Sequence, residues 1–239
     1  MGRASREFQR AFTLVELLVV IGIIAVLIAI LLPVLSRVKE QANRVKCAAN
    51  LRQLGASTMM YLDENKQFYP FPGVNGRAED WIYWEPGRDK NQGRLVKYQG
   101  KFFNEKLYRC PSDTNWDRRT YKYSYSINYR VTGWTGENIP SVKLPRIIRP
   151  SDKILYIDES DQTIDDGAWA PDHYFRTGDM HNLLSNRHDK TKEAQNNPKF
   201  GRGCVIYCDG HFEYCERWKS FDPYYNDPLY AGAPTNGAY

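Results

Sequence analysis

Apolar residues are concentrated in one stretch near the start of an otherwise polar chain. No charged residue occurs between Leu17 and Leu35, a run of 19 positions. As an α-helix this run would be about 28 Å long, which is close to the thickness of the hydrocarbon core of a bilayer. The pattern therefore predicts a membrane-spanning helix near the N-terminus.

The residues that follow the apolar stretch, 36 to 64, favour continuation of the helix. They contain no proline and few β-branched residues, whereas Pro70 and Pro72 oppose a helix soon afterwards. Semi-apolar residues recur here at intervals of three and four, which places them along one side of a helix. The residues on this side are Cys47, Leu51, Leu54, Thr58 and Tyr61. The downstream part of the chain is expected to cover them.

Beyond residue 66 the chain consists of short β-like runs separated by Gly, Pro, Asn and Asp. The clearest runs are 153–158, 203–208 and 211–216. No later segment has a helical pattern as strong as the first. These features predict an α+β fold in which the second half of a long N-terminal helix packs on an antiparallel β-sheet. Residues 185–203 are expected to form an exposed insertion.

The dipeptide Asp-Gly at 209–210 lies between two apolar runs and predicts a β-hairpin with a two-residue loop. Counting outward from this loop places Cys204 opposite Cys215, so a disulfide between them is the first hypothesis for the five cysteines. A disulfide between Cys47 and Cys110 is the second hypothesis. Because the number of cysteines is odd, either scheme leaves at least one free thiol.

The formal net charge of +5 is modest and spread along the chain, so it gives little support for nucleic-acid binding. A basic group follows the apolar stretch, where it can contact lipid headgroups or acidic neighbours, or form a solvated helix face. It consists of Arg37, Lys39, Arg44, Lys46 and Arg52. Because basic residues also precede the stretch, charge alone does not set the orientation of the predicted span.

The flanks of the apolar stretch distinguish it from an ordinary secretory signal. The residues from Pro33 to Arg37 offer no small-residue cleavage site on its far side. The preceding segment AFTLVE, residues 11–16, resembles the type III signal of type IV pilins and type II secretion pseudopilins. The resemblance implies that a prepilin peptidase cleaves between Ala11 and Phe12 and that Phe12 is N-methylated. Ala11 stands where those families usually have glycine, and Pro33 matches a proline that their helices commonly carry.

Glu16 is an acidic residue at the edge of a segment suited to hydrocarbon. A carboxylate in this setting costs about 3 kcal/mol on membrane-insertion scales, so a partner is expected. Cleavage before Phe12 would create an ammonium group four residues earlier on the same helix face. The family resemblance implies that Glu16 attracts the N-terminal amine of a neighbouring subunit during assembly.

The pilin resemblance implies four segments: a cleaved basic leader at 1–11, a membrane span and filament core at 12–35, an amphipathic continuation at 36–65, and an extracytoplasmic β-rich domain at 66–239. It implies a structural subunit of a type IV pilus or type II secretion-like filament, not an enzyme. The expected partners are like subunits, prepilin peptidase, the inner-membrane assembly machinery and membrane lipid. The expected location is the inner membrane, with a single pass, a cytoplasmic leader and a periplasmic C-terminal domain, and then a periplasmic or extracellular filament.

The abundant aromatic residues leave a second function open. Exposed tryptophans of an anchored or filament-tip domain can stack on sugars, which would make the chain a carbohydrate-binding module. Aromatic rings are, however, more often part of a core. The candidates are Trp81, Trp84, Trp116 and Trp134. The sequence contains no Gly-rich phosphate loop, Gly-x-Ser-x-Gly or His-Glu-x-x-His motif, so no catalytic residues are predicted.

Several downstream segments resemble a more particular group, the pilin-like proteins abundant in planctomycetes and their relatives. That group combines a prepilin-type N-terminus with a C-terminal His and Asp-Gly signature. The resemblance lies in segments 47–70, 109–113 and 123–128, and in the motifs Arg-His at 187–188 and Asp-Gly-His at 209–211. Twenty residues separate His188 from Asp209, where the usual pattern has nine.

The same C-terminal residues form a candidate metal site. The imidazoles of His188 and His211 and the carboxylate of Asp209 can bind a divalent ion such as zinc or calcium. Asp158, at the end of a predicted strand, can be a fourth ligand. A hydrogen-bond network without a metal is the alternative. The acidic loop 158–167 also offers oxygen ligands for calcium, although it does not fit the EF-hand template, and a solvated loop is the alternative there.

Overall fold

The computed structural model of the chain describes residues 14–73, 81–84, 87–133, 140–170, 182–197 and 200–235. The chain divides into two compact units, and the boundary falls between Gln41 and Ala42. The first unit contains the beginning of helix α1, and the second contains the rest of that helix together with the β-sheet.

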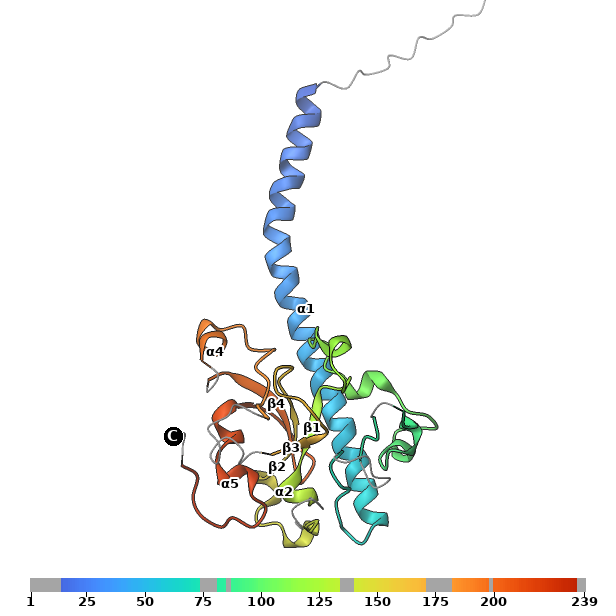
Figure 1. Cartoon of the computed structure of the whole chain (residues 1–239). Helices are drawn as coiled ribbons and strands as arrows, with labels where there is room; N and C mark the ends of the chain where they lie inside the picture. The colour runs from blue at the N-terminus through green and yellow to red at the C-terminus, as the bar shows by residue number, and fades with distance from the viewer. Residues whose placement is uncertain are drawn as a thin grey trace, which may run out of the picture. The chain divides into compact units, whose positions relative to one another are not determined.

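Helix α1 spans Leu14–Glu64 and continues through Pro33 (Figure 1). In the first unit its large apolar side chains are exposed all around the helix, with exposed fractions from 73% at Leu14 to 46% at Val20. The 22 residues from 14 to 35 extend for about 33 Å, which is enough to cross the hydrocarbon core of a bilayer. Within the described part of the chain, α1 is the one helix that is long and apolar enough for this.

In the second unit, α1 is buried along one side against the sheet. The predicted semi-apolar side of the helix is confirmed: Cys47, Leu51, Leu54 and Thr58 are fully buried, and Tyr61 is half-buried. The hydroxyl groups of Thr58 and Tyr156 are hydrogen-bonded at 2.8 Å, so the helix is joined to strand β2 (Ile154–Asp158) by a polar contact as well as by apolar packing. Gly55 permits the close approach, because a Cβ atom there would lie 3.1 Å from the side chain of Ile206.

The sheet has five strands in the order β3-β1-β2-β4-β5. Their bounds are Tyr125–Asn128 for β1, Ile154–Asp158 for β2, Ala168–Trp169 for β3, Arg202–Tyr207 for β4 and Phe212–Glu216 for β5. The α+β fold with a long helix on a sheet is as predicted, but the sheet is mixed and not purely antiparallel. β3 pairs in parallel with β1, because the chain after β2 returns to the outer edge of β1 and places Ala168 beside Ile127.

The other helices within the described residues are short. Those of α type are α2 at Tyr129–Thr132, α4 at Lys192–Asn196 and α5 at Pro223–Asn226. The 3-10 helices are Lys90–Gln92, Val96–Tyr98, Glu105–Tyr108, Trp116–Arg118, Leu144–Arg146, Pro150–Asp152 and Arg217–Ser220. Segment 185–203 is less exposed than predicted, because it contains α4 and buries Ser185, His188 and Ala194.

The β4–β5 hairpin differs from its prediction by one residue. Its loop has three residues, since the Tyr207 N–H donates to the carbonyl of His211 and the Gly210 N–H donates to the carbonyl of Tyr207. Gly210 has a φ of +89°, the left-handed conformation that closes a three-residue hairpin loop.

The hairpin register rules out the Cys204–Cys215 pairing in this structure. Cys204 lies opposite Tyr214, and Cys215 lies opposite Gly203. A shift of one residue turns a side chain to the other face of a sheet, so the two cysteines belong to separate core clusters. All five cysteines are buried and carry free thiols.

Candidate functional site

The residues predicted to direct processing and assembly lie at or before the start of α1. Ala11 and Phe12 fall outside the described residues. Glu16 lies in the first turn of α1, beside the exposed apolar side chains of Leu14 and Leu17. A carboxylate is favoured in the first turn by the partial positive charge of a helix N-terminus. The structure therefore presents Glu16 at the beginning of an exposed apolar helix surface.

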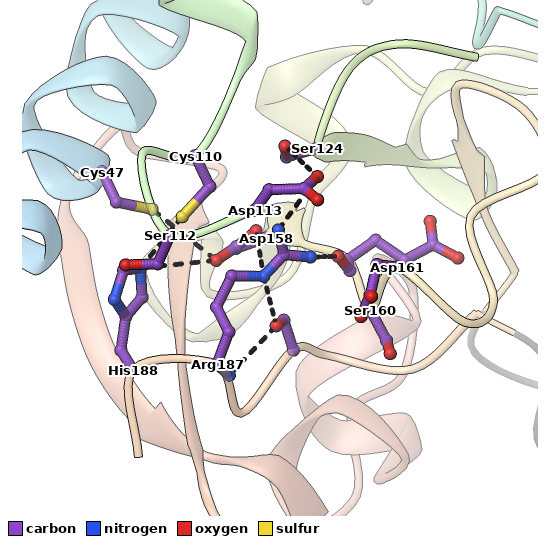
Figure 2. A network of polar contacts seen from close by, with 12 residues as sticks. Cys47, Cys110, Ser112, Asp113, Ser124, Asp158, Ser160, Asp161, Arg187 and His188 are labelled. Atoms are coloured by element: carbon purple, nitrogen blue, oxygen red, sulfur yellow. Dashed lines mark hydrogen bonds and ion pairs between the residues drawn. The ribbon is translucent and has the colours of Figure 1, made fainter. Parts of the chain in front are cut away.

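A second group of polar residues lies inside the second unit (Figure 2). Cys47 comes from α1, Cys110 follows the 3-10 helix at Glu105–Tyr108, Asp158 ends β2, and His188 lies in the loop that precedes α4. We call Cys47, Cys110, Asp158 and His188 the buried ligand cluster. All four residues are buried, and their ligand atoms lie within 4.8 Å of one another.

The distances inside the buried ligand cluster are short. The Nε2 atom of His188 lies 3.1 Å from Cys110 Sγ and 3.6 Å from Asp158 Oδ2. Asp158 Oδ2 lies 3.7 Å from Cys47 Sγ. A tetrahedral zinc ion with ordinary bond lengths sets its ligand atoms about 3.3–3.8 Å apart. The cluster can therefore hold a metal ion.

Hydrogen bonds outside the cluster fix the loops that carry its members. Asn50, one helical turn after Cys47, donates to the carbonyl groups of Lys106 and Arg109 at 2.9 and 3.0 Å. These bonds hold the segment before Cys110 against α1. On the other side, the Ser185 N–H donates to the carbonyl of Asp158 at 2.7 Å, which ties the start of the His188 loop to the end of β2.

Arg187 connects the cluster to a second carboxylate, Asp113. Its Nη1 lies 3.0 Å from Asp113 Oδ2, and its Nε lies 3.6 Å from Asp158 Oδ1 (Figure 2). Arg119 and Ser124 also donate to Asp113, each at 2.6 Å. Although burial alone would raise the pKa of Asp113, Arg187, Ser124 and Arg119 together hold this pKa below its ordinary value. Asp113 is therefore a well-compensated buried anion.

The acidic side chains of the buried ligand cluster have less compensation for a negative charge than Asp113 has. Burial raises the pKa of Asp158 above its ordinary value, against the opposing attraction of Arg187 and His188. Burial also raises the pKa of the Cys47 and Cys110 thiols well above the usual value. In the absence of a cation the interior thus favours the protonated forms, whereas a bound metal ion would favour the deprotonated ones.

The structure brings together two of the four predicted metal ligands, His188 and Asp158. Asp209 and His211 are absent from the buried ligand cluster and form a pair in the β4–β5 loop, where His211 Nδ1 lies 2.6 Å from Asp209 Oδ1. Both side chains of this pair are more than a third exposed. The places expected for Asp209 and His211 are taken by Cys47 and Cys110, which the sequence presented as a candidate disulfide.

The acidic loop after β2 is less solvated than its charge suggests. Glu159 is fully buried and accepts hydrogen bonds from the hydroxyl groups of Ser126 and Thr163. Asp161 accepts a hydrogen bond from the amide of Asn115, and Asp166 accepts one from the backbone of Ala168. These three carboxylates thus accept hydrogen bonds from protein donors, and Asp158 is the one residue of the predicted loop 158–167 that belongs to the buried ligand cluster.

The predicted sugar-binding tryptophans have different surroundings. Trp81 and Trp84 are buried, and the Trp81 indole N–H donates to the carbonyl of Gly167 at 3.0 Å. Trp116 is half-buried, with the guanidinium group of Arg109 3.7 Å from its ring centre. Trp134 lies outside the described residues. At least two of the four candidates therefore belong to the core.

The long helix with an exposed apolar first part and a sheet packed on its second part defines an α+β, pilin-like fold. Residues 8–32 match the family model described as the prokaryotic N-terminal methylation motif. This match supports a type IV pilin-like protein, a class of structural proteins that are normally not enzymes, and an N-terminal helix that anchors in a membrane. Comparison of the chain with curated proteins and with solved structures gives no match.

Proposed function

We propose that the chain is a structural subunit of a type IV pilus or type II secretion-like filament. In this proposal a prepilin peptidase cleaves between Ala11 and Phe12, and Phe12 becomes N-methylated. The observation that carries the proposal is the methylation motif at residues 8–32, which includes the beginning of an apolar helix with an exposed surface.

The exposed apolar surface of α1 needs a non-aqueous environment. A contiguous surface of this kind is unfavourable in water and marks a site of contact with lipid or with protein. Lipid covers it while the subunit resides in the inner membrane, and the helices of like subunits cover it in the filament. The same side chains serve in both settings, so a subunit can leave the membrane without refolding.

Glu16 gives the assembly its register in this proposal. Its carboxylate lies in the first turn of α1, at the edge of the apolar surface. After cleavage, the new amine of Phe12 on one subunit and Glu16 on its neighbour form an ion pair in a poorly solvated environment. Such a pair is much stronger than one in water, and the loss of one partner leaves an uncompensated charge.

The proposal also assigns a location to each segment of the chain. The leader 1–11 is cytoplasmic, the span anchors the subunit to the inner membrane, and the C-terminal domain is periplasmic until the assembly machinery incorporates the subunit. The carbohydrate-binding alternative has less support, because Trp81 and Trp84 are buried and cannot stack on a sugar.

The test is the Glu16→Gln variant of the full chain, produced in cells that contain a prepilin peptidase and a filament machinery. We expect a normal mature N-terminus at Phe12 by mass spectrometry and normal amounts in the membrane fraction. The filament fraction obtained by shearing should fall at least about tenfold, because the variant loses the charge that pairs with the neighbouring amine.

Glu40→Gln is the matched control. Glu40 lies on the same helix beyond the apolar stretch, so this variant should assemble like the unmodified chain. The proposal is wrong if the mature chain still begins at Met1 in cells with active peptidase, or if Glu16→Gln forms filaments in normal amounts.

A further inference from the structure

Filament assembly does not explain the buried ligand cluster. We propose that it binds a zinc ion in a closed tetrahedral site, which fixes the second half of α1 to the sheet and its loops. The ligands are Cys47 Sγ, Cys110 Sγ, Asp158 Oδ2 and His188 Nε2. The site is structural and not catalytic, because four protein ligands fill a tetrahedral zinc and leave no position for a substrate.

The donor set selects the metal. Two thiolates and an imidazole are ligands that zinc prefers, whereas calcium and magnesium require oxygen ligands and larger coordination numbers. All four side chains are buried, as in structural zinc sites that exclude water. Calcium, one of the two ions expected from the sequence, therefore does not suit this cluster.

One neighbour of Cys47 is a hydrogen-bond donor that suits a metal-bound thiolate. The hydroxyl of Tyr125, which is itself fully buried, donates to Cys47 Sγ at 3.4 Å. A thiolate accepts such a bond far better than a neutral thiol, whose sulfur is a weak acceptor. Donors of this kind around a ligand atom typically orient it toward a metal.

The charges balance when zinc is present. Two thiolates and the Asp158 carboxylate carry three negative charges, against two positive charges on the ion. Arg187 lies 3.6 Å from Asp158 Oδ1 and supplies the remaining positive charge. Asp113, which Arg187 also contacts, has a second cationic partner in Arg119 at 2.6 Å. The site as a whole is therefore neutral, as a buried ionic group needs to be.

Without a cation, Asp158 is poorly satisfied. Within the described part of the chain its Oδ1 atom makes no hydrogen bond, although the residue is fully buried. Its Oδ2 atom is approached by Cys47 Sγ at 3.7 Å and by His188 Nε2 at 3.6 Å, distances that are long for strong hydrogen bonds. Buried carboxylates normally have several good donors, and coordination to zinc would give Oδ2 the close partner that it lacks, while Arg187 remains beside Oδ1.

The site would join segments that are far apart in the sequence. Cys47 and Asp158 are 111 residues apart, and Cys110 and His188 are 78 residues apart. A metal that binds the folded chain and not the unfolded one adds its binding free energy to the stability of the fold. Coordination would also keep the thiols of Cys47 and Cys110 from forming a disulfide.

The experiment uses the full chain in detergent, purified without chelator and without added metal. Elemental analysis should find about one zinc per chain, the stoichiometry of a closed site. The protein is then stripped with a chelator under reducing conditions and titrated separately with zinc, calcium and magnesium. Zinc at about a thousand times its Kd should raise Tm by about 10 °C, and the other two ions should not.

Cys47→Ala and Cys208→Ala form a matched pair of variants. Both cysteines are fully buried in the same core cluster, but Cys208 is not among the four ligands. Cys47→Ala should lose its zinc and its zinc-dependent rise in Tm, whereas Cys208→Ala should keep both. If Cys47→Ala does not fold, the titration of the stripped unmodified chain still decides the question.

Three results would overturn the zinc site. The first is a reduced, stripped chain that does not take up zinc. The second is zinc retention by Cys47→Ala. The third is a Cys47–Cys110 disulfide in the protein as purified, seen as a linked peptide by mass spectrometry and a loss of two free thiols.

Discussion

Replacement of Leu54 by alanine tests how firmly the second half of α1 is attached to the sheet. Leu54 is fully buried and belongs to the same core cluster as Tyr156 and Ile206. The substitution removes three carbon groups, which is a loss of about 2.4 kcal/mol in transfer free energy. The cavity left behind brings the expected loss in the free energy of unfolding to about 3–4 kcal/mol. For a unit of about 200 residues this lowers Tm by about 6–16 °C.

The assay is thermal unfolding of the full chain in detergent, followed by tryptophan fluorescence, because Trp81 is buried in that same core cluster. Met60→Ala is the control, since Met60 lies on the same helix but is 53% exposed. It should change Tm by no more than about 2 °C. Equal effects of the two variants would mean that Leu54 does not face the sheet, and the described packing of α1 would be wrong.

Two further predictions concern polar groups in the same domain. Tyr156→Phe removes the 2.8 Å hydrogen bond to Thr58 and should lower the free energy of unfolding by about 1 kcal/mol, measured by denaturant titration. Asp113→Asn should cost about 3 kcal/mol at pH 7, because it leaves buried arginines without their anion. The lowered pKa of Asp113 means that its contribution is complete above the unfolded-state pKa and is lost as the pH falls through the folded one. The unmodified chain should therefore lose stability in acid more steeply than Asp113→Asn, whereas the exposed Asp117→Asn should retain the full slope.

The long helix and the three main strands could be predicted because their signals are local. The spacing of Cys47, Leu51 and Leu54 defines a helix face whatever covers it, and the structure buries this face. β3 could not be predicted, because a strand of two residues has no periodicity. Its parallel pairing with β1 depends on the path that the chain takes through the rest of the fold.

The hairpin register was predicted wrongly for a reason visible in β4. This strand is buried on both faces, so alternation of apolar and polar residues does not indicate which side chains face α1. Ile206 and Cys204 face the cluster that includes α1, while Val205 and Tyr207 belong to the other cluster. An Asp-Gly dipeptide is compatible with a two-residue or a three-residue loop, and here Gly210 adopts the conformation of the longer one.

The buried ligand cluster shows a similar limit. His188 and Asp158 were identified from residue type and from a family resemblance. Cys47 and Cys110 were missed as ligands because their neighbourhood arises from tertiary contacts, such as those that Asn50 makes with the segment before Cys110. The second disulfide hypothesis, Cys47 with Cys110, requires these two cysteines to lie near each other. This proximity is the signal that could have identified them as ligands of one metal site.

The proposed filament role and the proposed zinc site make separable demands on one helix. The proposed cleavage and methylation would depend on the signal at residues 8–32, so they should be unaffected by loss of Cys47. Zinc binding depends on side chains that all lie in the second unit, so it should be unaffected by Glu16→Gln. A Cys47→Ala chain that is processed normally but unfolds at a lower temperature, together with a Glu16→Gln chain that keeps its zinc but does not assemble, would support both proposals independently. A change in zinc content caused by Glu16→Gln would contradict this separation, because no side chain of the site belongs to the apolar part of α1.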